Sequence, residues 1–298
     1  MTHSILDSVA ANGRSHIVPL RTSGAGSPPL FCFPGSNGSV LVFQEMATTL
    51  PEGYPVYGIE MDSLVATDEQ FTIEQLSSFY LDVIRKIQGT GPYYFCGYSF
   101  GGLVAYEMAM RLIEEGDRAN LVALLDAPNP AHLKNISVAD SMEFHKTYMV
   151  DRLKQYGQLL LRGDIATIRR KAFALLLSRF GFLFVPVLKF GFRMVKKPLP
   201  LIFRANDPNA GFLKAWRSYV PKQSDQEVVL FRTQDRGPEY DLDPSMGWNA
   251  CVNGGLQIHI IPGGHLDMMS MPAVRVVAEK LAAYLDNGSN LKESTGTA

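Results

Sequence analysis

The sequence predicts an α/β protein with a mostly parallel sheet that helices cover on both faces. Short apolar runs alternate with helical patterns along residues 16–128 and again along 225–287. Such uninterrupted apolar runs are typical of strands buried on both faces. The chain has 298 residues, of which 46% are hydrophobic, and this suffices for a full core. We expect residues 1–15 to be a polar leader, residues 129–224 an insertion and residues 288–298 a disordered tail.

The predicted elements follow one another in a regular order. Pro19 indicates that the first strand lies at an edge of the sheet, and Thr72 and Gln75 form a capping box that opens a helix. Pro272 fits the first turn of the last helix, which we expect to end near Leu285. The predicted strands are residues 16–20, 30–33, 55–60, 93–96, 121–125, 227–233 and 256–261, and the predicted helices are 40–50, 72–88, 103–115 and 272–285.

Residues 97–101 read Gly-Tyr-Ser-Phe-Gly and lie between a predicted strand and a predicted helix. This is the pattern of a nucleophile elbow, in which a sharp turn exposes one serine hydroxyl at the end of a sheet. Glycine at 97 and 101 leaves room for the crowded backbone. The helix that follows presents N–H groups where an oxyanion would form. We therefore predict that Ser99 is a nucleophile rather than part of an ordinary turn.

A serine hydroxyl needs a base, and His265 is the best candidate. It follows the strand 256–261 in a Pro-Gly-Gly loop, late in the chain. Polar residues at the carboxyl ends of parallel strands meet at one edge of the sheet, where sites of α/β proteins lie. His259 falls inside the strand and is interpreted as structural.

Two aspartates follow strand ends and could orient the histidine. Asp126 comes directly after the apolar strand 121–125, and Asp235 comes after the next strand. Either could hold the imidazole in one tautomer. We favour Asp126, because its strand delivers it abruptly to the edge of the sheet. The oxyanion hole is predicted from the backbone N–H groups of Phe100, after the nucleophile, and Ser36, in a glycine-containing loop.

Together these motifs resemble the thioesterase domains that end polyketide and nonribosomal peptide assembly lines. The resemblance rests on four stretches: Pro29 to Pro34, Gly97 to Glu107, Leu124 to Pro128, and Gly247-Trp248 with Gly254 to Met269. It implies an α/β-hydrolase fold with a helical lid inserted after the strand that ends at Asp126. The assembly-line branch places its acid at that position, whereas discrete editing thioesterases tend to place it at the position of Asp235.

The resemblance implies acyl transfer. Ser99 would take an acyl or peptidyl chain from the phosphopantetheine arm of a carrier domain, and water or a nucleophile within the chain would release it as an acid or a ring. No metal and no cofactor of the protein's own is expected. An editing thioesterase, an esterase or lipase acting on small soluble substrates, and a catalytically silent binding module remain alternatives.

The predicted insertion is rich in phenylalanine and in positive charge. Between Arg152 and Phe203 there are eleven lysine or arginine residues and one acid, which leaves ten net positive charges. The simplest interpretation is a set of lid helices with solvated charges. A second adds an acyl channel and a basic face for an acidic carrier, and a third places a basic helix on a membrane surface. The candidate channel residues are Phe180, Phe184, Trp216 and Tyr219.

Bulk composition excludes several classes. A formal net charge of −1 gives no field that would attract nucleic acid. The three cysteines show no paired spacing, which argues against a disulfide framework or a zinc site. Residues 1–20 lack the apolar region of a signal peptide, and no uncharged apolar run reaches spanning length. We therefore expect a cytoplasmic protein.

Overall fold

The computed structural model describes residues 16–23, 27–36, 38–60, 71–131, 211–235 and 243–290. They contain a seven-stranded sheet with the order β1-β3-β2-β4-β5-β6-β7. β1 pairs antiparallel with β3, and the other five pairings are parallel. The predicted mostly parallel sheet with an edge strand near Pro19 is therefore confirmed. The strands are β1 (Ile17–Arg21), β2 (Leu30–Phe33), β3 (Val56–Ile59), β4 (Tyr93–Tyr98), β5 (Ala119–Leu125), β6 (Val228–Thr233) and β7 (Leu256–Ile261).

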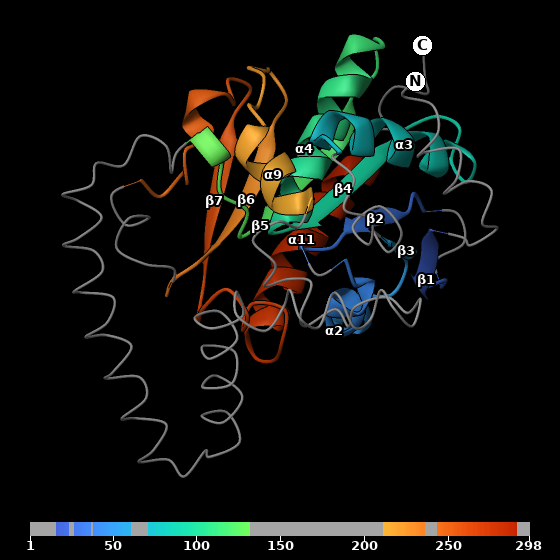
Figure 1. Cartoon of the computed structure of the whole chain (residues 1–298). Helices are drawn as coiled ribbons and strands as arrows, with labels where there is room; N and C mark the ends of the chain where they lie inside the picture. The colour runs from blue at the N-terminus through green and yellow to red at the C-terminus, as the bar shows by residue number, and fades with distance from the viewer. Residues whose placement is uncertain are drawn as a thin grey trace, which may run out of the picture.

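Helices cover both faces of this sheet. Figure 1 shows α3, α4 and α9 on one side and α2 on the other. The bounds are η1 (Val40–Phe43), α2 (Gln44–Thr49), α3 (Ile73–Arg85), α4 (Phe100–Glu114), α9 (Gly211–Ser218), η2 (Trp248–Ala250) and α11 (Ala273–Asn290). Within the described residues, no helix is both long and apolar enough to cross a membrane.

Alternation along the strands produces two separate cores. In β4, Tyr93 and Phe95 pack with α3 and α4, whereas Tyr94 and Cys96 pack with α2 and α11. β2 and β5 alternate in the same way, because successive side chains of a strand point to opposite faces. The central strands β2, β4 and β5 are thus buried on both faces, and their carboxyl ends meet at one edge of the sheet.

Several element boundaries differ from the prediction. The helix expected over residues 40–50 is a 3-10 turn, η1, followed by the short helix α2. The last helix runs through Gly288 to Asn290 instead of ending near Leu285, so residues 288–290 of the expected disordered tail are helical. A single glycine costs a helix only about 1 kcal/mol and need not end it. The capping box of Thr72 and Gln75 is confirmed.

Most of the predicted insertion lies outside the described residues. These exclude 1–15, 132–210 and 291–298, so the leader, the channel residues Phe180 and Phe184 and the basic segment stay predictions. Near the end of the insertion the chain contains α9, a helix that the sequence pattern alone did not place. Its Ala215 is buried against the same core as α4.

Candidate active site

Ser99 occupies a strained turn between β4 and α4. Its backbone has φ 54° and ψ −119°, a conformation that residues with a side chain rarely adopt. The Ser99 N–H donates to the Leu125 carbonyl at 2.8 Å, and the Gly102 N–H donates to the Ser99 carbonyl at 3.0 Å. The turn therefore ties the end of β4 to the end of β5 and starts α4 at once. This is the geometry that the Gly-Tyr-Ser-Phe-Gly pattern predicted.

The two elbow glycines are required by close backbone contacts. A Cβ on Gly97 would lie 2.1 Å from the carbonyl oxygen of Gly101, and one on Gly101 would lie 2.0 Å from the carbonyl oxygen of Phe33. Neither neighbour is a flexible side chain, so neither could move aside cheaply. The prediction that only glycine fits at 97 and 101 is confirmed.

Asp126 and His265 meet at the same edge of the sheet. The distance from His265 Nδ1 to Asp126 Oδ2 is 2.6 Å, and the Asp126 side chain is fully buried. A carboxylate only accepts hydrogen bonds, so Nδ1 carries the proton and Nε2 is left to act as a base. The other carboxylate oxygen, Oδ1, accepts from the backbone N–H of Thr233 at 3.0 Å. Asp126 itself has φ 49°, a second strained residue at a strand end.

The loop that carries His265 is held from two sides. The Gly264 N–H donates to Asp267 Oδ2 at 3.1 Å, and the Asp235 N–H donates to the Gly263 carbonyl at 3.1 Å. Asp235 is exposed, and the interaction that it makes with this loop is through its backbone. The imidazole meets the carboxylate of Asp126, which is the acid that the sequence favoured.

Tyr98, the residue before Ser99, contacts the histidine directly. Its hydroxyl donates to the His265 carbonyl at 2.7 Å, and its ring stacks on the imidazole with centroids 4.9 Å apart and planes 16° apart. Since Tyr98 and Ser99 are consecutive, the base lies beside the strand end that carries the serine.

The loop after β2 also borders the same tyrosine. A Cβ on Gly35 would be 3.4 Å from the Tyr98 ring and 3.5 Å from the Ser99 Cβ. Ser36 follows this glycine and is half-buried. Phe100 is the first residue of α4 and is buried. The two predicted N–H donors thus belong to segments that border Ser99.

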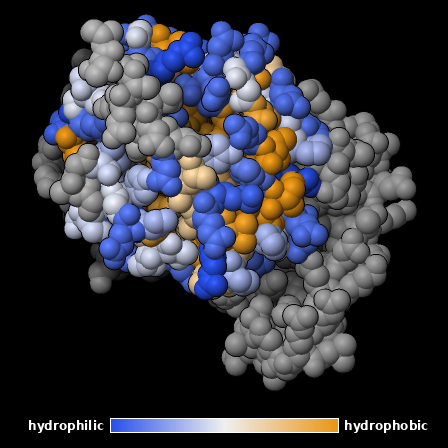
Figure 2. Space-filling model, turned by 180° about the vertical axis from the view of Figure 1, so that it is seen from behind, coloured by the Kyte–Doolittle hydropathy of each residue, from blue (hydrophilic) through white to orange (hydrophobic). Residues whose placement is uncertain are grey.

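A groove opens beside the histidine loop. It encloses about 500 Å³ and is lined by apolar and mostly neutral polar side chains: Leu41, Val42, Gln44, Glu45, Thr48, Leu266, Met269 and Ser270. Leu41 is 67% exposed and Leu266, which follows the histidine, is 76% exposed. The groove thus presents both apolar and polar side chains. Figure 2 shows another view of the surface, in which small apolar patches lie between polar residues.

The channel candidates in the described part of the insertion are packed against α4. Tyr219 is 2% exposed, and its hydroxyl donates to Glu107 Oε2 at 2.9 Å. Trp216 is partly buried against the same core. Burial raises the pKa of Glu107, and the hydrogen bond from Tyr219 opposes that shift. These are the contacts of packing anchors, and a role toward substrate stays a prediction for both residues.

Other candidate groups are structural. The His259 Nε2 lies 2.6 Å from the Tyr284 hydroxyl, on the edge strand β7. All three cysteines are free and buried, and burial raises the pKa of Cys32 and raises that of Cys251 to about 11. Across the described ranges, no three His, Cys, Asp or Glu side chains are grouped as a metal site would require.

Residues 28–168 match the family model of the thioesterase domain. This stretch of the chain is therefore similar to a thioesterase domain. Its fold is that of the α/β-hydrolases, as solved relatives show. The thioesterase domain NocB, in a covalent complex with a fluorophosphonate nocardicin G analog, superposes with a TM-score of 0.62 at 17% identity and covers 90% of this chain and 99% of its own.

Much longer relatives contain a region similar to this chain. A dimodular nonribosomal peptide synthase of Bacillus subtilis is 34% identical over 278 residues, which is 91% of this chain and 11% of the relative. Malpinin synthetase of Mortierella alpina is 28% identical over 269 residues, which is 89% of this chain and 3% of the relative. The chain thus spans a small part of the length of each of these curated relatives.

Sequence reasoning missed the residues that support the site. Tyr98 stands inside the elbow motif, and an aromatic residue next to a nucleophile was the signal that could have identified it. Thr233 acts through its backbone N–H, which no sequence pattern marks. Trp248 was noted in the Gly247-Trp248 stretch of the family resemblance, and its indole Nε1 donates to the Ala127 carbonyl at 2.7 Å, one residue after Asp126.

Proposed function

We propose that this protein is a serine thioesterase that releases an acyl or peptidyl chain from the phosphopantetheine arm of a carrier domain. The observation that carries the proposal is the hydrogen bond between the buried Asp126 and His265, whose imidazole stacks on the residue that precedes the strained Ser99. A serine at a sharp strand-to-helix turn and an oriented imidazole beside that strand end supply the nucleophile and the base that acyl transfer requires.

In the first half-reaction, Ser99 Oγ attacks the carbonyl carbon of the thioester while His265 Nε2 takes the hydroxyl proton. The backbone N–H groups of Phe100 and Ser36 stabilise the oxyanion of the tetrahedral intermediate. The C–S bond then breaks, and the imidazolium returns its proton to the leaving sulfur. Asp126 holds the imidazole in the required tautomer and stabilises its cationic form.

In the second half-reaction, a water or a nucleophile within the acyl chain attacks the acyl-serine. His265 takes the proton of this nucleophile, the C–O bond to Ser99 breaks, and the serine oxygen recovers the proton. The product is a free acid or a ring. The pantetheine arm belongs to the substrate, so the chemistry requires no cofactor held by the protein.

The groove beside His265 supports a carrier-bound substrate. A pantetheine arm is a flexible chain with neutral amides and short apolar segments, and the groove offers Leu41 and Leu266 next to Gln44, Thr48 and Ser270. The Bacillus relative is named a nonribosomal peptide synthase, which agrees with a chain delivered by a carrier domain.

A discrete editing thioesterase is the second candidate. Its acid would be Asp235, whose backbone N–H already bonds the histidine loop at Gly263. An esterase acting on small oxygen esters is a further alternative with the same nucleophile.

Two measurements test the proposal. A fluorophosphonate should label Ser99, identified by peptide mass spectrometry, and the variant Ser99→Ala should not be labelled. Acyl-pantetheine thioesters should then be cleaved faster than oxygen esters with the same acyl group, and the masses of the products distinguish hydrolysis from ring closure. Absence of labelling would indicate a silent binding module, and preference for the oxygen ester would indicate an esterase.

A further inference from the structure

Tyr98 links the two halves of the proposed catalytic machinery. It ends β4, directly before Ser99, and is 7% exposed. Its ring has the His265 imidazole on one side and the loop of Gly35 near its edge. One buried side chain thus contacts the base and borders the segment that carries a predicted oxyanion donor.

The histidine loop needs such support because it follows an edge strand. β7 pairs with β6 at the end of the sheet, and the loop after it contains Gly263 at φ 89°. The His265 side chain is 30% exposed. The hydrogen bond from Tyr98 to the His265 carbonyl, at 2.7 Å, joins residues that are 167 positions apart. It fixes the backbone of the base relative to the strand that carries the nucleophile.

We infer that Tyr98 is a positioning residue that holds His265 in line with Ser99. Two interactions do this. The phenol hydroxyl fixes the histidine backbone, and the stacked ring fixes the plane of the imidazole, whose Nδ1 bonds Asp126. The inference rests on the proposed function, since it assigns to Tyr98 an effect that is exerted through His265. Small displacements of a base are costly, because proton transfer needs hydrogen-bond distance.

The two interactions can be separated by substitution. Tyr98→Phe removes the hydrogen bond and keeps the stacked ring, so kcat should fall about two- to tenfold with little change in KM. Tyr98→Leu removes both, and kcat should fall about 10- to 100-fold. A kcat that is higher for Tyr98→Phe than for Tyr98→Leu would indicate that the stacked ring contributes to positioning.

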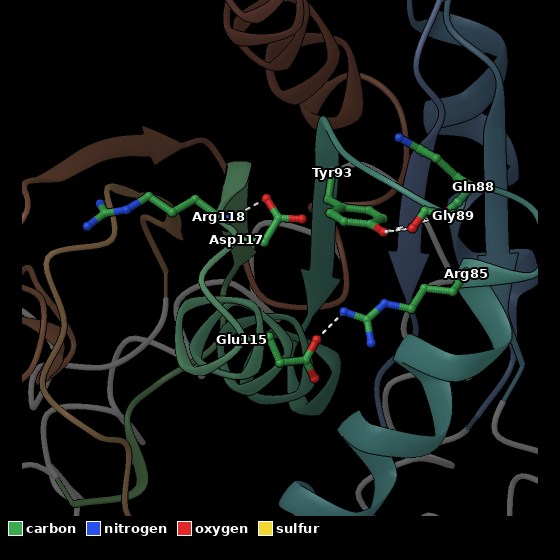
Figure 3. Close-up of polar contacts among 7 residues, drawn as sticks. All are labelled: Arg85, Gln88, Gly89, Tyr93, Glu115, Asp117 and Arg118. Carbon is green, nitrogen blue, oxygen red and sulfur yellow. Dashed lines mark hydrogen bonds and ion pairs between the residues drawn. The ribbon is translucent and has the colours of Figure 1, made fainter.

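Tyr93 provides a matched control on the same strand. It begins β4, and its hydroxyl donates to the carbonyls of Gln88 at 3.3 Å and Gly89 at 3.2 Å, as Figure 3 shows for Gly89. Tyr93→Phe therefore loses the same kind of bond, phenol to backbone carbonyl, at the other end of the strand. It should leave kcat within about twofold of the unchanged protein.

The decisive experiment combines Tyr98→Leu with His265→Ala and measures the rate constant of Ser99 labelling by a fluorophosphonate. We expect Tyr98→Leu to slow labelling 10- to 100-fold when His265 is present and less than about twofold when it is absent, because coupled residues are not additive. Thermal unfolding of each variant identifies any that fail to fold, and in that case Tyr98→Phe and Tyr93→Phe still decide the question.

Three results would overturn the inference. An equal slowing by Tyr98→Leu in both backgrounds would mean that Tyr98 acts on Ser99 or on folding. A loss in Tyr93→Phe as large as that in Tyr98→Phe would mean that the bond is only structural. Labelling of His265→Ala at the unchanged rate would refute the proposed function itself, and this result is distinguishable because it does not involve Tyr98.

Discussion

The two ends of β4 carry the same kind of hydrogen bond in very different surroundings. At the amino end, Tyr93 bonds the turn of Gln88 and Gly89, next to an ion pair between Arg85 and Glu115 (Figure 3). At the carboxyl end, Tyr98 bonds the backbone of His265. The amino end has partly exposed charges, whereas the carboxyl end has a fully buried carboxylate, Asp126.

Backbone strain also distinguishes the carboxyl end of β4 from its amino end. Ser99 and Asp126, each directly after a parallel strand, have positive φ. Strain of this kind costs about 1–3 kcal/mol per residue and persists only where surrounding structure enforces it. Backbone strain and a buried carboxylate thus distinguish the carboxyl ends of β4 and β5, where parallel topology gathers the site, from the amino end of β4. The predictions below test that division.

The largest expected effect is the loss of the acid. Asp126→Asn keeps the shape of the side chain but removes the charge that orients His265, so kcat should fall about 10³- to 10⁴-fold. Asp235→Asn is the matched control and should stay within about twofold. Steady-state hydrolysis of one acyl-pantetheine thioester compares them, and the opposite ranking would transfer the acid role to Asp235.

The next effect concerns the elbow. Gly101→Ala places a Cβ 2.0 Å from the Phe33 carbonyl oxygen, and because backbone cannot move aside cheaply we expect a loss of about 3 kcal/mol or more in the free energy of unfolding. Gly89→Ala, at the amino end, meets its nearest atom at 3.9 Å and should change this quantity by less than about 0.5 kcal/mol. Urea unfolding measures both, and similar values would show that the elbow is not tightly packed.

A smaller effect tests the buried carboxyl of Glu107, which lies on α4 away from the proposed catalytic residues. Burial raises the pKa of Glu107, so the folded protein keeps a proton that the unfolded chain has lost just above the ordinary pKa. The free energy of unfolding should therefore fall as pH rises from about 4.5 through the raised pKa. Glu107→Gln removes this titration, so its stability relative to the unchanged protein should improve with pH while kcat is retained. Thermal melts between pH 4 and 8 measure this difference, and a constant difference would contradict the raised pKa.

The smallest effect is expected at the amino end. The ion pair of Arg85 and Glu115 is partly exposed, with side chains 33% and 43% accessible. Arg85→Ala should cost no more than about 1 kcal/mol, and less at high salt. A double-mutant cycle with Glu115→Ala isolates the pair, and a coupling well above that value would show that this end also stores substantial energy.

Local sequence patterns predicted most of the fold and identified the nucleophile. The uninterrupted apolar runs and the helical patterns predicted the alternation of strands and helices, because burial on both faces demands apolar strands. Gly97 and Gly101 marked Ser99 because the turn leaves no room for a Cβ there. The break between η1 and α2 and the extension of α11 through Gly288 were not predicted, since element ends depend on packing as well as propensity.

By itself, then, the sequence determined the sheet, the position of Ser99 and the candidacy of His265, since each depends on residues that are adjacent along the chain. It left both Asp126 and Asp235 as candidates for the catalytic acid, and it assigned no role to Tyr98. Only the tertiary structure decided that Asp126 meets the imidazole, because the order of β5, β6 and β7 and the backbone N–H of Thr233 fix where each carboxylate lies. The contact between Tyr98 and His265 joins residues 167 positions apart, and such a distance can be closed only by the folded sheet.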